Sequence, residues 1–379
     1  MSMTETTLDV QRPVPFLNLR PMHDGIAEAL LADIAELIDS SAFTNGPAVA
    51  EFEAAFAEYC GVGHCVGVAS GLDALRLGLI GAGLEPGDRV VVPAQTFMAT
   101  FEAVTQAGGV PVPVDISAAD YAIDATRVEA VLDERTRFVM PVHLYGQVAD
   151  MSAIMQLASR HGLRVIEDAA QAHGARRDGR LAGSSGLAGA FSFYPGKNLG
   201  AMGDAGALVT NDGELAAKVR ALREHGQTAK YRHAYEGWTG RLDTIQALVL
   251  ARKLPLLDGW NAQRRTIAAS YTDALAGIGD VVTPAVPAGS EPVWHLYVIR
   301  TASRDRLAEH LRTHGIGTGI HYPDPPHLIA PYANLGYGRG SFPESERLAD
   351  EALSLPMFPG MNEEDVAAVV HAIRAFFNG

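Results

Sequence analysis

Residues 164–171, with the sequence RVIEDAAQ, pass within a few positions from apolar to acidic and small side chains. The run 164–166 is short, apolar and followed by a turn, which is typical of a buried strand. Asp168 therefore stands at the carboxyl end of a strand, the edge at which α/β sheets bind ligands. Taken alone, an acid in this place is more often a helix N-cap than a functional group, so the rest of the chain must decide.

A second strand-like run, residues 188–193, leads into the sequence SFYPGKN at 192–198. Lys197 follows a Pro-Gly turn, so its stem can point back over the edge of the sheet. A lone lysine in a turn usually faces solvent, but Lys197 and Asp168 together favour a functional site at that edge. A P-loop is excluded, because that motif needs glycine where Phe191 stands and Ser or Thr where Asn198 stands.

Outward from these two motifs, short β-branched runs alternate with segments of helical periodicity. Short apolar strands separated by helices are typical of a largely parallel sheet covered on both faces, so the expected fold class is α/β. The expected strands are residues 65–69, 89–92, 110–114, 138–142, 164–166, 188–193 and 207–210. The expected helices include residues 26–38, 49–59, 214–224 and 243–254, the last ended by Pro255.

The C-terminal third changes character. Helical segments at 262–275, 304–314 and 363–377 surround a strand at 294–300, which indicates a smaller α+β domain. The expected organisation is an N-terminal arm at residues 1–14, a large domain at 15–256 and a small C-terminal domain at 257–379.

Composition limits the function classes. The chain has 379 residues and a formal net charge of −14, which argues against nucleic-acid binding. Its two cysteines, Cys60 and Cys65, lack the spacing of a metal site, and no metal is expected. The N-terminus has no apolar core of a signal peptide, and no apolar run reaches the length of a membrane span. A cytoplasmic protein is therefore expected.

Five motifs appear in order at residues 70–75 (SGLDAL), 93–97 (PAQTF), 167–171 (EDAAQ), 192–200 (SFYPGKNLG) and 240–243 (GRLD). Together they resemble the DegT/DnrJ/EryC1/StrS family, which are fold-type-I aminotransferases that use pyridoxal 5′-phosphate and act on nucleotide-linked keto-sugars. The match covers nearly the whole chain. It implies an aspartate-aminotransferase-like large domain and a homodimer with shared active sites.

The resemblance implies a role for each cofactor-binding residue. Lys197 carries pyridoxal phosphate as a Schiff base and moves the proton, with pyridoxamine phosphate as the other form of the cofactor. Asp168 keeps the pyridine nitrogen protonated, which makes the ring an electron sink. Gln171 hydrogen-bonds the phenolic oxygen, and Phe97 stacks on the ring. The expected phosphate contacts are Gly71, Leu72, Ser192 and Thr239.

Two positions depart from the family pattern. Leu72 stands where members usually have threonine, so a hydroxyl is lost while the amide remains. Thr239 stands where members usually have an asparagine that reaches the phosphate from the neighbouring subunit, and it is shorter but still a donor. Dehydratase relatives have histidine where this chain has Lys197, so transamination is favoured.

The segment 321–328 (HYPDPPHL) resembles a signature common among enzymes of 3-keto-sugars. It implies amination at C3 of a dTDP-linked deoxyhexose, with an amino acid such as L-glutamate as the donor. A proline-rich surface turn is the alternative explanation of this segment. The expected substrate contacts are Tyr194, Arg232, His233, Arg241, His321, Tyr322 and His327.

Two other functions stay open from the sequence. One keeps the enzyme and changes the substrate to a 4-keto-sugar or a cyclitol ketone such as an inosose. The other belongs to a different class, a regulatory protein that binds pyridoxal phosphate without turnover. All the chemical positions are intact, which favours the enzyme.

Overall fold

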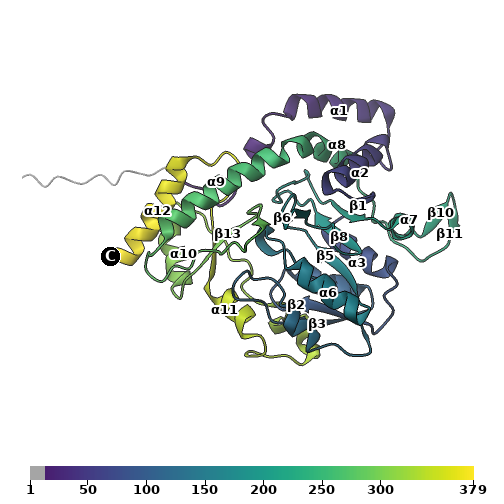
Figure 1. Cartoon of the computed structure of the whole chain (residues 1–379). Coiled ribbons are helices and arrows are strands. Elements are labelled where there is room, and N and C mark those ends of the chain that lie inside the picture. Colours follow the sequence, from purple (N-terminus) through teal and green to yellow (C-terminus); the bar gives the residue numbers. More distant parts are fainter. Residues whose placement is uncertain (1–12) are drawn as a thin grey trace, which may run out of the picture.

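A sheet with the strand order β1-β9-β8-β5-β4-β2-β3 forms the centre of the computed structural model, which describes residues 13–379 (Figure 1). The arm expected at 1–14 thus lies almost entirely outside the described residues. Neighbouring strands from β8 to β3 are parallel, and only β9 runs against its neighbours. The expected α/β class with a mostly parallel sheet is confirmed. The strands are β1 (His64–Val68), β2 (Arg89–Pro93), β3 (Val110–Val114), β4 (Thr136–Val139), β5 (Arg164–Asp168), β8 (Ala188–Ser192) and β9 (Gly206–Thr210).

One strand ends earlier than the sequence predicts. β4 ends at Val139, although the apolar run continues to Val142. Pro141 has no N–H to donate, so the hydrogen-bond ladder stops before it. Beyond the proline, Val142 forms a single parallel bridge with Asp168, the last residue of β5. The chain therefore still lies beside β5 where that strand ends.

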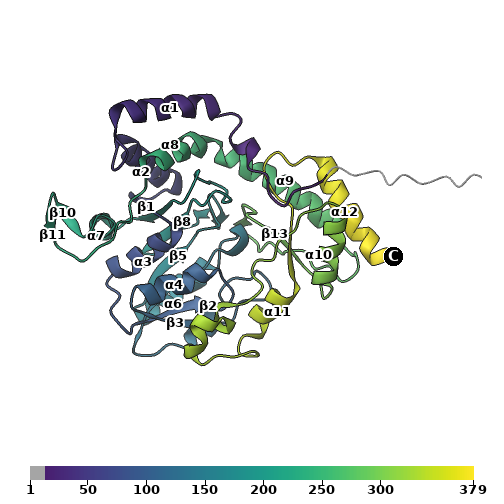
Figure 2. The ribbon, with the colours of Figure 1, turned by 180° about the vertical axis from the view of Figure 1, so that it is seen from behind.

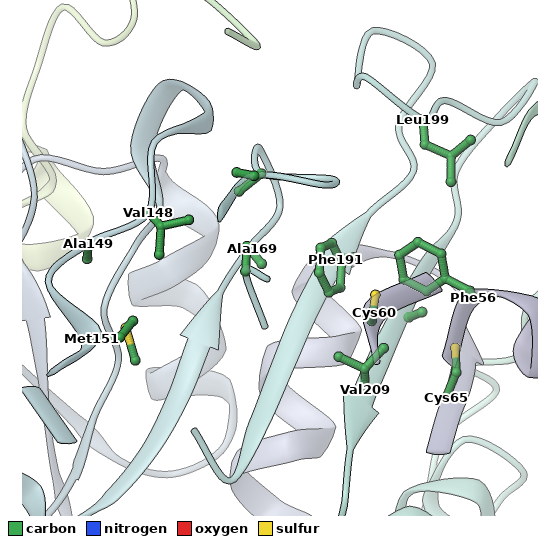
Figure 3. Packing of buried hydrophobic residues seen from close by; sticks show 14 of the residues in the cluster. Phe56, Cys60, Cys65, Val148, Ala149, Met151, Ala169, Phe191, Leu199 and Val209 are labelled. Atoms are coloured by element: carbon green, nitrogen blue, oxygen red, sulfur yellow. The ribbon is translucent and has the colours of Figure 1, made fainter. Parts of the chain in front are cut away.

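Alternating side chains build a hydrophobic core on each face of the sheet. Val90 and Val92 belong to one core and Val91 to the other, as the period of two in a strand requires. Helices α3, α4 and α7 contribute to the first core, and α2, α6 and α8 to the second. In the second core Phe56 packs edge-on against Phe191 (Figure 3). These helices are α2 (Pro47–Cys60), α3 (Gly71–Gly81), α4 (Met98–Gln106), α6 (Met151–His161), α7 (Gly213–Leu222) and α8 (Thr244–Lys253).

The C-terminal elements have a hydrophobic core of their own. β13 (Tyr297–Arg300) pairs antiparallel with β14 (Ala352–Leu355), and apolar side chains from three helices pack around the pair. Figure 2 shows these elements at the end of the molecule away from β1. The helices are α9 (Leu257–Leu275), α10 (Arg304–Thr313) and α12 (Glu363–Asn378). The sequence prediction omits β14 and the neighbouring helix α11 (Pro343–Glu351).

The sequence predicts that Pro255 ends a helix, but in the structure helical turns continue through this proline. A 3-10 turn, η3 (Leu254–Leu256), joins the end of α8 directly to α9. Proline is accepted in a first helical turn, because the N–H that it lacks has no partner there. The helix expected at 262–275 therefore begins earlier, at Leu257. Among residues 13–379, no helix has the length and apolar character needed to cross a bilayer.

The remaining elements are one helix of 14 residues and several short segments. They are α1 (Ala27–Ser40), α5 (Ala125–Glu129), the strands β6 (Arg176–Arg177), β7 (Arg180–Leu181), β10 (Gln227–Ala229), β11 (Arg232–His233) and β12 (Ser290–Glu291), and the 3-10 turns η1 (Arg20–Met22), η2 (Leu144–Gly146), η4 (Pro326–Leu328) and η5 (Ala330–Leu335).

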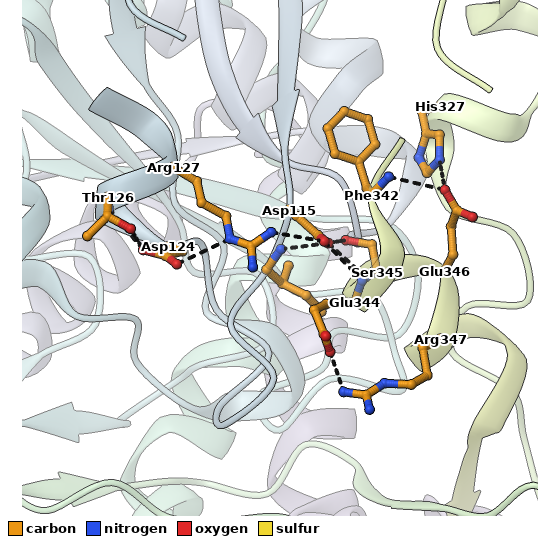
Figure 4. A network of polar contacts seen from close by, with 11 residues as sticks. Asp115, Asp124, Thr126, Arg127, His327, Phe342, Glu344, Ser345, Glu346 and Arg347 are labelled. Atoms are coloured by element: carbon orange, nitrogen blue, oxygen red, sulfur yellow. Dashed lines mark hydrogen bonds and ion pairs between the residues drawn. The ribbon is translucent and has the colours of Figure 1, made fainter. Parts of the chain in front are cut away.

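A polar network joins the end of β3 to α11 (Figure 4). The buried Asp115 carboxylate accepts hydrogen bonds from the backbone amides of Glu344 and Ser345 at 2.9 and 2.8 Å. Arg127 pairs with the same carboxylate at 3.1 Å. Asp115 thus satisfies free amides at the start of α11 and connects the C-terminal elements to the central sheet.

Candidate active site

Loops that follow the parallel strands meet at one edge of the sheet, as expected for this fold class. Asp168 ends β5, Ser192 ends β8, and Lys197 lies in the loop beyond β8. The loops after β1 and β2 lead to Gly71 and Phe97, which stand at the starts of α3 and α4. Together these residues line a cavity of about 590 Å³.

The Asp168 carboxylate is almost completely buried beside this cavity, with 6% of the residue exposed. The Thr100 hydroxyl donates to its Oδ2 at 2.8 Å, and the Ala170 amide donates to its Oδ1 at 3.2 Å. Burial raises the pKa of Asp168, while these hydrogen bonds and the charge of Lys197 oppose the rise. A buried carboxylate with few partners is well suited to pair with a cationic group that a ligand brings.

The Lys197 side chain lines the same cavity, and a tight turn sets its place. Its backbone amide donates to the Tyr194 carbonyl at 2.8 Å. Gly200 lets the loop close, because a Cβ there would lie 2.3 Å from the Pro195 carbonyl oxygen. Burial lowers the pKa of Lys197 to about 8, while the Asp168 carboxylate acts in the opposite direction. Part of the amine is therefore neutral near pH 7, as a nucleophile or base must be.

The start of α3 presents backbone amides to the cavity. Ser70 caps the helix by accepting a hydrogen bond from the Asp73 amide at 3.0 Å. The amides of Gly71 and Leu72 come earlier in the first turn, where no intrahelical acceptor exists. Gly71 is required for close packing, since a Cβ would lie 2.7 Å from the Cβ of Ser192. The amides and the Ser192 hydroxyl together suit an anionic group such as a phosphate.

Gln171 is held at both ends of its side-chain amide. Its Oε1 accepts a hydrogen bond from the Tyr145 backbone amide at 2.6 Å, and its Nε2 donates to the Tyr322 hydroxyl at 3.0 Å. The Tyr322 ring in turn lies 5.2 Å, centroid to centroid, from the ring of Phe97. The segment after α10 thus brings Tyr322 against residues that follow the central strands.

His321 also lines the cavity, and its Nδ1 lies 2.9 Å from the Ser354 hydroxyl. Burial and the charge of Lys197 lower the pKa of His321 to about 4, so the ring is neutral at pH 7. Tyr194 lines the cavity too, although 59% of the residue is exposed.

The expected contacts at 232–241 do not line the cavity within the single chain. Arg232 and His233 form β11, which pairs with β10 in a hairpin at the end of the molecule opposite α12 (Figure 1, Figure 2). The Thr239 hydroxyl bonds the His225 ring at 2.9 Å. Arg241 forms an ion pair with Glu224 at 2.9 Å.

His327 likewise does not line the cavity. Its side chain is buried, and its Nε2 lies 3.2 Å from Glu346 Oε1 (Figure 4). Phe342 packs edge-on against the ring. His327 therefore takes part in the packing of α11 against η4.

The structure brings polar residues to the site that the sequence prediction omits, among them Thr100 and His295. Thr100 bonds Asp168 from the first turns of α4, and its spacing of four from Thr96 in the motif 93–97 is a signal that could have indicated it. His295 lines the cavity beside Asn198, which lies 3.2 Å from its Nδ1. It carries no motif and stands where a strand was expected, so only the fold reveals it.

A partly neutral lysine amine and a buried acid share one cavity at the edge of a parallel sheet. A lysine that forms a covalent link must have a neutral amine, and a buried acid can balance the charge of a cationic group bound beside it. The fold and the cavity thus fit an α/β enzyme that reacts through a lysine.

Comparison with known proteins narrows the class. Residues 24–374 match the sequence profile of the DegT/DnrJ/EryC1/StrS aminotransferase family, and the chain belongs to this family. It is 46% identical over 361 residues to the dTDP-3-amino-3,4,6-trideoxy-alpha-D-glucose transaminase of Streptomyces venezuelae, with 95% of each chain covered.

Two solved structures are similar over nearly the whole chain. The crystal structure of S. venezuelae DesV in complex with a ketimine intermediate has a TM-score of 0.95 at 46% identity, covering 97% of this chain and 99% of that one. NtdA from Bacillus subtilis with the bound cofactor PMP has a TM-score of 0.90 at 30% identity, covering 97% and 86%. The expected family and fold type are confirmed.

Proposed function

We propose that this enzyme is a pyridoxal-phosphate-dependent aminotransferase that moves an amino group from L-glutamate to C3 of a dTDP-linked keto-deoxyhexose. The observation that carries the proposal is that Lys197 and Asp168 line one cavity with the amide-bearing start of α3. The S. venezuelae transaminase, which is named for a 3-amino sugar, supports amination at C3. The bound PMP of NtdA supports the cofactor.

The cavity residues fit pyridoxal phosphate. The amides of Gly71 and Leu72 with the Ser192 hydroxyl would hold the phosphate, because free amides at a helix start bind anions. The close packing of Gly71 against Ser192 keeps these donors together. The Asp168 carboxylate would pair with a protonated pyridine nitrogen. Gln171 would donate to the phenolic oxygen, and Phe97 would cover the ring. When bound, the cofactor supplies an electron sink for the carbon that gains or loses a proton.

The chain's own residues then perform the proton chemistry. Lys197 would hold the cofactor, and its Nζ would take a proton from the neighbouring carbon and return it. Burial favours this exchange, because a pKa of about 8 lets Nζ hold or release a proton near neutral pH. His321 and Tyr322 line the same cavity and would help to keep water away from Nζ.

The positions of the residues at 232–241 agree with a homodimer whose subunits share their active sites. Thr239, Arg232, His233 and Arg241 do not line the cavity of their own chain, so we propose that they act at the site of a partner subunit. The separate core around β13 and β14 supports a division into a large domain at 15–256 and a small domain at 257–379.

Capture of pyridoxal phosphate by the apoprotein is expected to speed up as the pH rises through about 8 and to level off above it. Only the unprotonated Lys197 amine reacts, and burial lowers the pKa that governs it. Stopped-flow absorbance in the visible band of the bound cofactor measures the rate at each pH. A midpoint near the ordinary lysine value of about 10.4 would contradict the buried environment.

Replacing Thr100 with valine is expected to lower kcat/KM about tenfold, because the hydroxyl is a hydrogen-bond donor to the Asp168 carboxylate. Steady-state kinetics with glutamate and the keto-sugar would measure the change. Thr105→Val is the matched control: its hydroxyl bonds the Phe101 carbonyl of the same helix, and its rate should stay unchanged. Equal rates for both variants would remove Thr100 from the site.

The proposed function is tested by mixing the purified protein with pyridoxal phosphate, L-glutamate and a dTDP-linked 3-keto-deoxyhexose. The visible band should bleach with glutamate and return with the sugar, and NMR of the product should show the new C–N bond at C3. A bond at C4, or turnover only with an inosose, would replace the sugar assignment. Binding of the cofactor without exchange with any amino donor would favour a regulatory protein.

A further inference from the structure

Asn198, the residue after Lys197, fixes the position of a proton on a neighbouring histidine. The Asn198 side chain is buried, and its Nδ2 donates to the Val293 carbonyl at 2.8 Å and to Asn261 Oδ1 at 2.9 Å. A backbone carbonyl can only accept, so the nitrogen of the amide must face Val293. The other atom, Oδ1, lies 3.2 Å from His295 Nδ1. Because this oxygen also only accepts, the hydrogen must lie on His295 Nδ1.

The second ring nitrogen of His295 is then left without a proton. Burial, together with the charges of Lys197 and Arg264, lowers the pKa of His295 well below its ordinary value, so the ring is neutral at pH 7. Within residues 13–379, Nε2 has no hydrogen-bond partner, and the residue lines the cavity. A lone pair is therefore available at a fixed ring nitrogen of a residue that lines the same cavity as Lys197.

We propose that His295 is a substrate-binding residue whose Nε2 accepts a hydrogen bond from the N–H or O–H group that the substrate carries beside the reacting carbon. The inference rests on the proposed function, since it takes the reacting carbon to lie next to Lys197. An acceptor in this place binds a hydroxyl or an ammonium group and repels a carboxylate or a phosphate. It would therefore help to orient the substrate in the cavity.

Recognition fits His295 better than proton transfer. A general base must hold a proton for part of the cycle, and a ring beside Lys197 and Arg264 resists a second positive charge. The Asn198 contact also prevents the ring from changing tautomer without losing a buried hydrogen bond.

Neutron diffraction of the holoenzyme would show the protons directly. Deuterium is expected on Nδ1, between His295 and Asn198, and none on Nε2. Deuterium on Nε2 would overturn the inference and leave the proposed function untouched. If the wild-type enzyme shows no amino transfer, the proposed function fails, and this measurement still decides whether a bare acceptor faces the cavity.

Kinetics of the two half-reactions test the role in binding. His295→Phe keeps an aromatic ring and is expected to lower kcat/KM about tenfold or more in the half-reaction whose substrate uses the acceptor. Cofactor affinity should stay unchanged, and His295→Gln should recover part of the loss because its amide oxygen can accept.

The matched control is His173→Phe, since His173 is a buried ring packed beside Phe191 and Phe193 that does not line the cavity. Its kinetics should equal those of the wild type. Changes below twofold in both half-reactions of His295→Phe would overturn the inference. So would a loss of cofactor affinity that His295→Gln does not recover, since that indicates a structural role.

Discussion

Replacing Lys197 with alanine is expected to lower kcat for multiple-turnover amino transfer by about 10⁴-fold, the upper end of what a positioned acid–base group contributes. Lys197 is the one lysine lining the cavity within residues 13–379. No other amine can therefore receive the proton at the same place. Burial also lowers the pKa of this amine to about 8. Steady-state rates with L-glutamate and the keto-sugar, together with the visible spectrum, measure the loss.

Two controls make the Lys197 result specific. Lys218→Ala removes an amine that packs over the ring of Tyr235, away from the cavity, and should leave the rate unchanged. Added methylamine should restore part of the Lys197→Ala rate, because a small amine can enter the space of the missing side chain. Lys253 also has a pKa of about 8, but it bonds the Gly200 carbonyl and does not line the cavity. A residual rate above a tenth of the wild type would contradict the assignment of Lys197.

The positions of Lys197 and Asp168 at the sheet edge could be predicted because each follows a short apolar strand. Parallel strands place their carboxyl ends at one edge, so the order of motifs along the chain already brings the two residues together. The end of a strand was less predictable where a proline interrupts an apolar pattern that continues beyond it. Pro141 ends the ladder of β4 although Val142 continues the pattern.

Contacts between residues that are far apart along the chain could not be predicted from the sequence. His295 faces the cavity because Asn198, far away along the chain, lies against it, and no local pattern marks such a pair. Conversely, His327 belongs to a segment that resembles a substrate-binding signature, yet its ring turns to Glu346. A motif specifies residue types and spacing, whereas the direction of each side chain depends on what packs against it.

Replacing Asp168 with asparagine is expected to lower kcat by about 10²- to 10³-fold, the range found when one preorganised electrostatic contact is removed. Asparagine keeps the shape of the side chain and can still accept from the Thr100 hydroxyl or the Ala170 amide. It carries no negative charge, so a protonated ring nitrogen would lose its partner. Single-turnover kinetics with glutamate isolate this step from product release.

The same substitution should leave the apoprotein at least as stable as the wild type. Burial raises the folded-state pKa of Asp168 above the ordinary 3.8, so ionisation is less favourable in the folded chain than in the unfolded one. The ionised carboxylate therefore destabilises the folded apoprotein at pH 7, and this effect disappears as the pH falls through the two pKa values. The variant Asp168→Asn has no such charge, so its Tm without cofactor should equal or exceed that of the wild type at pH 7. The difference should shrink as the medium is made more acidic. A variant with a lower apoprotein Tm at pH 7 would show that the carboxylate stabilises the fold, and the loss of activity would then no longer identify Asp168 as a residue kept for the cofactor.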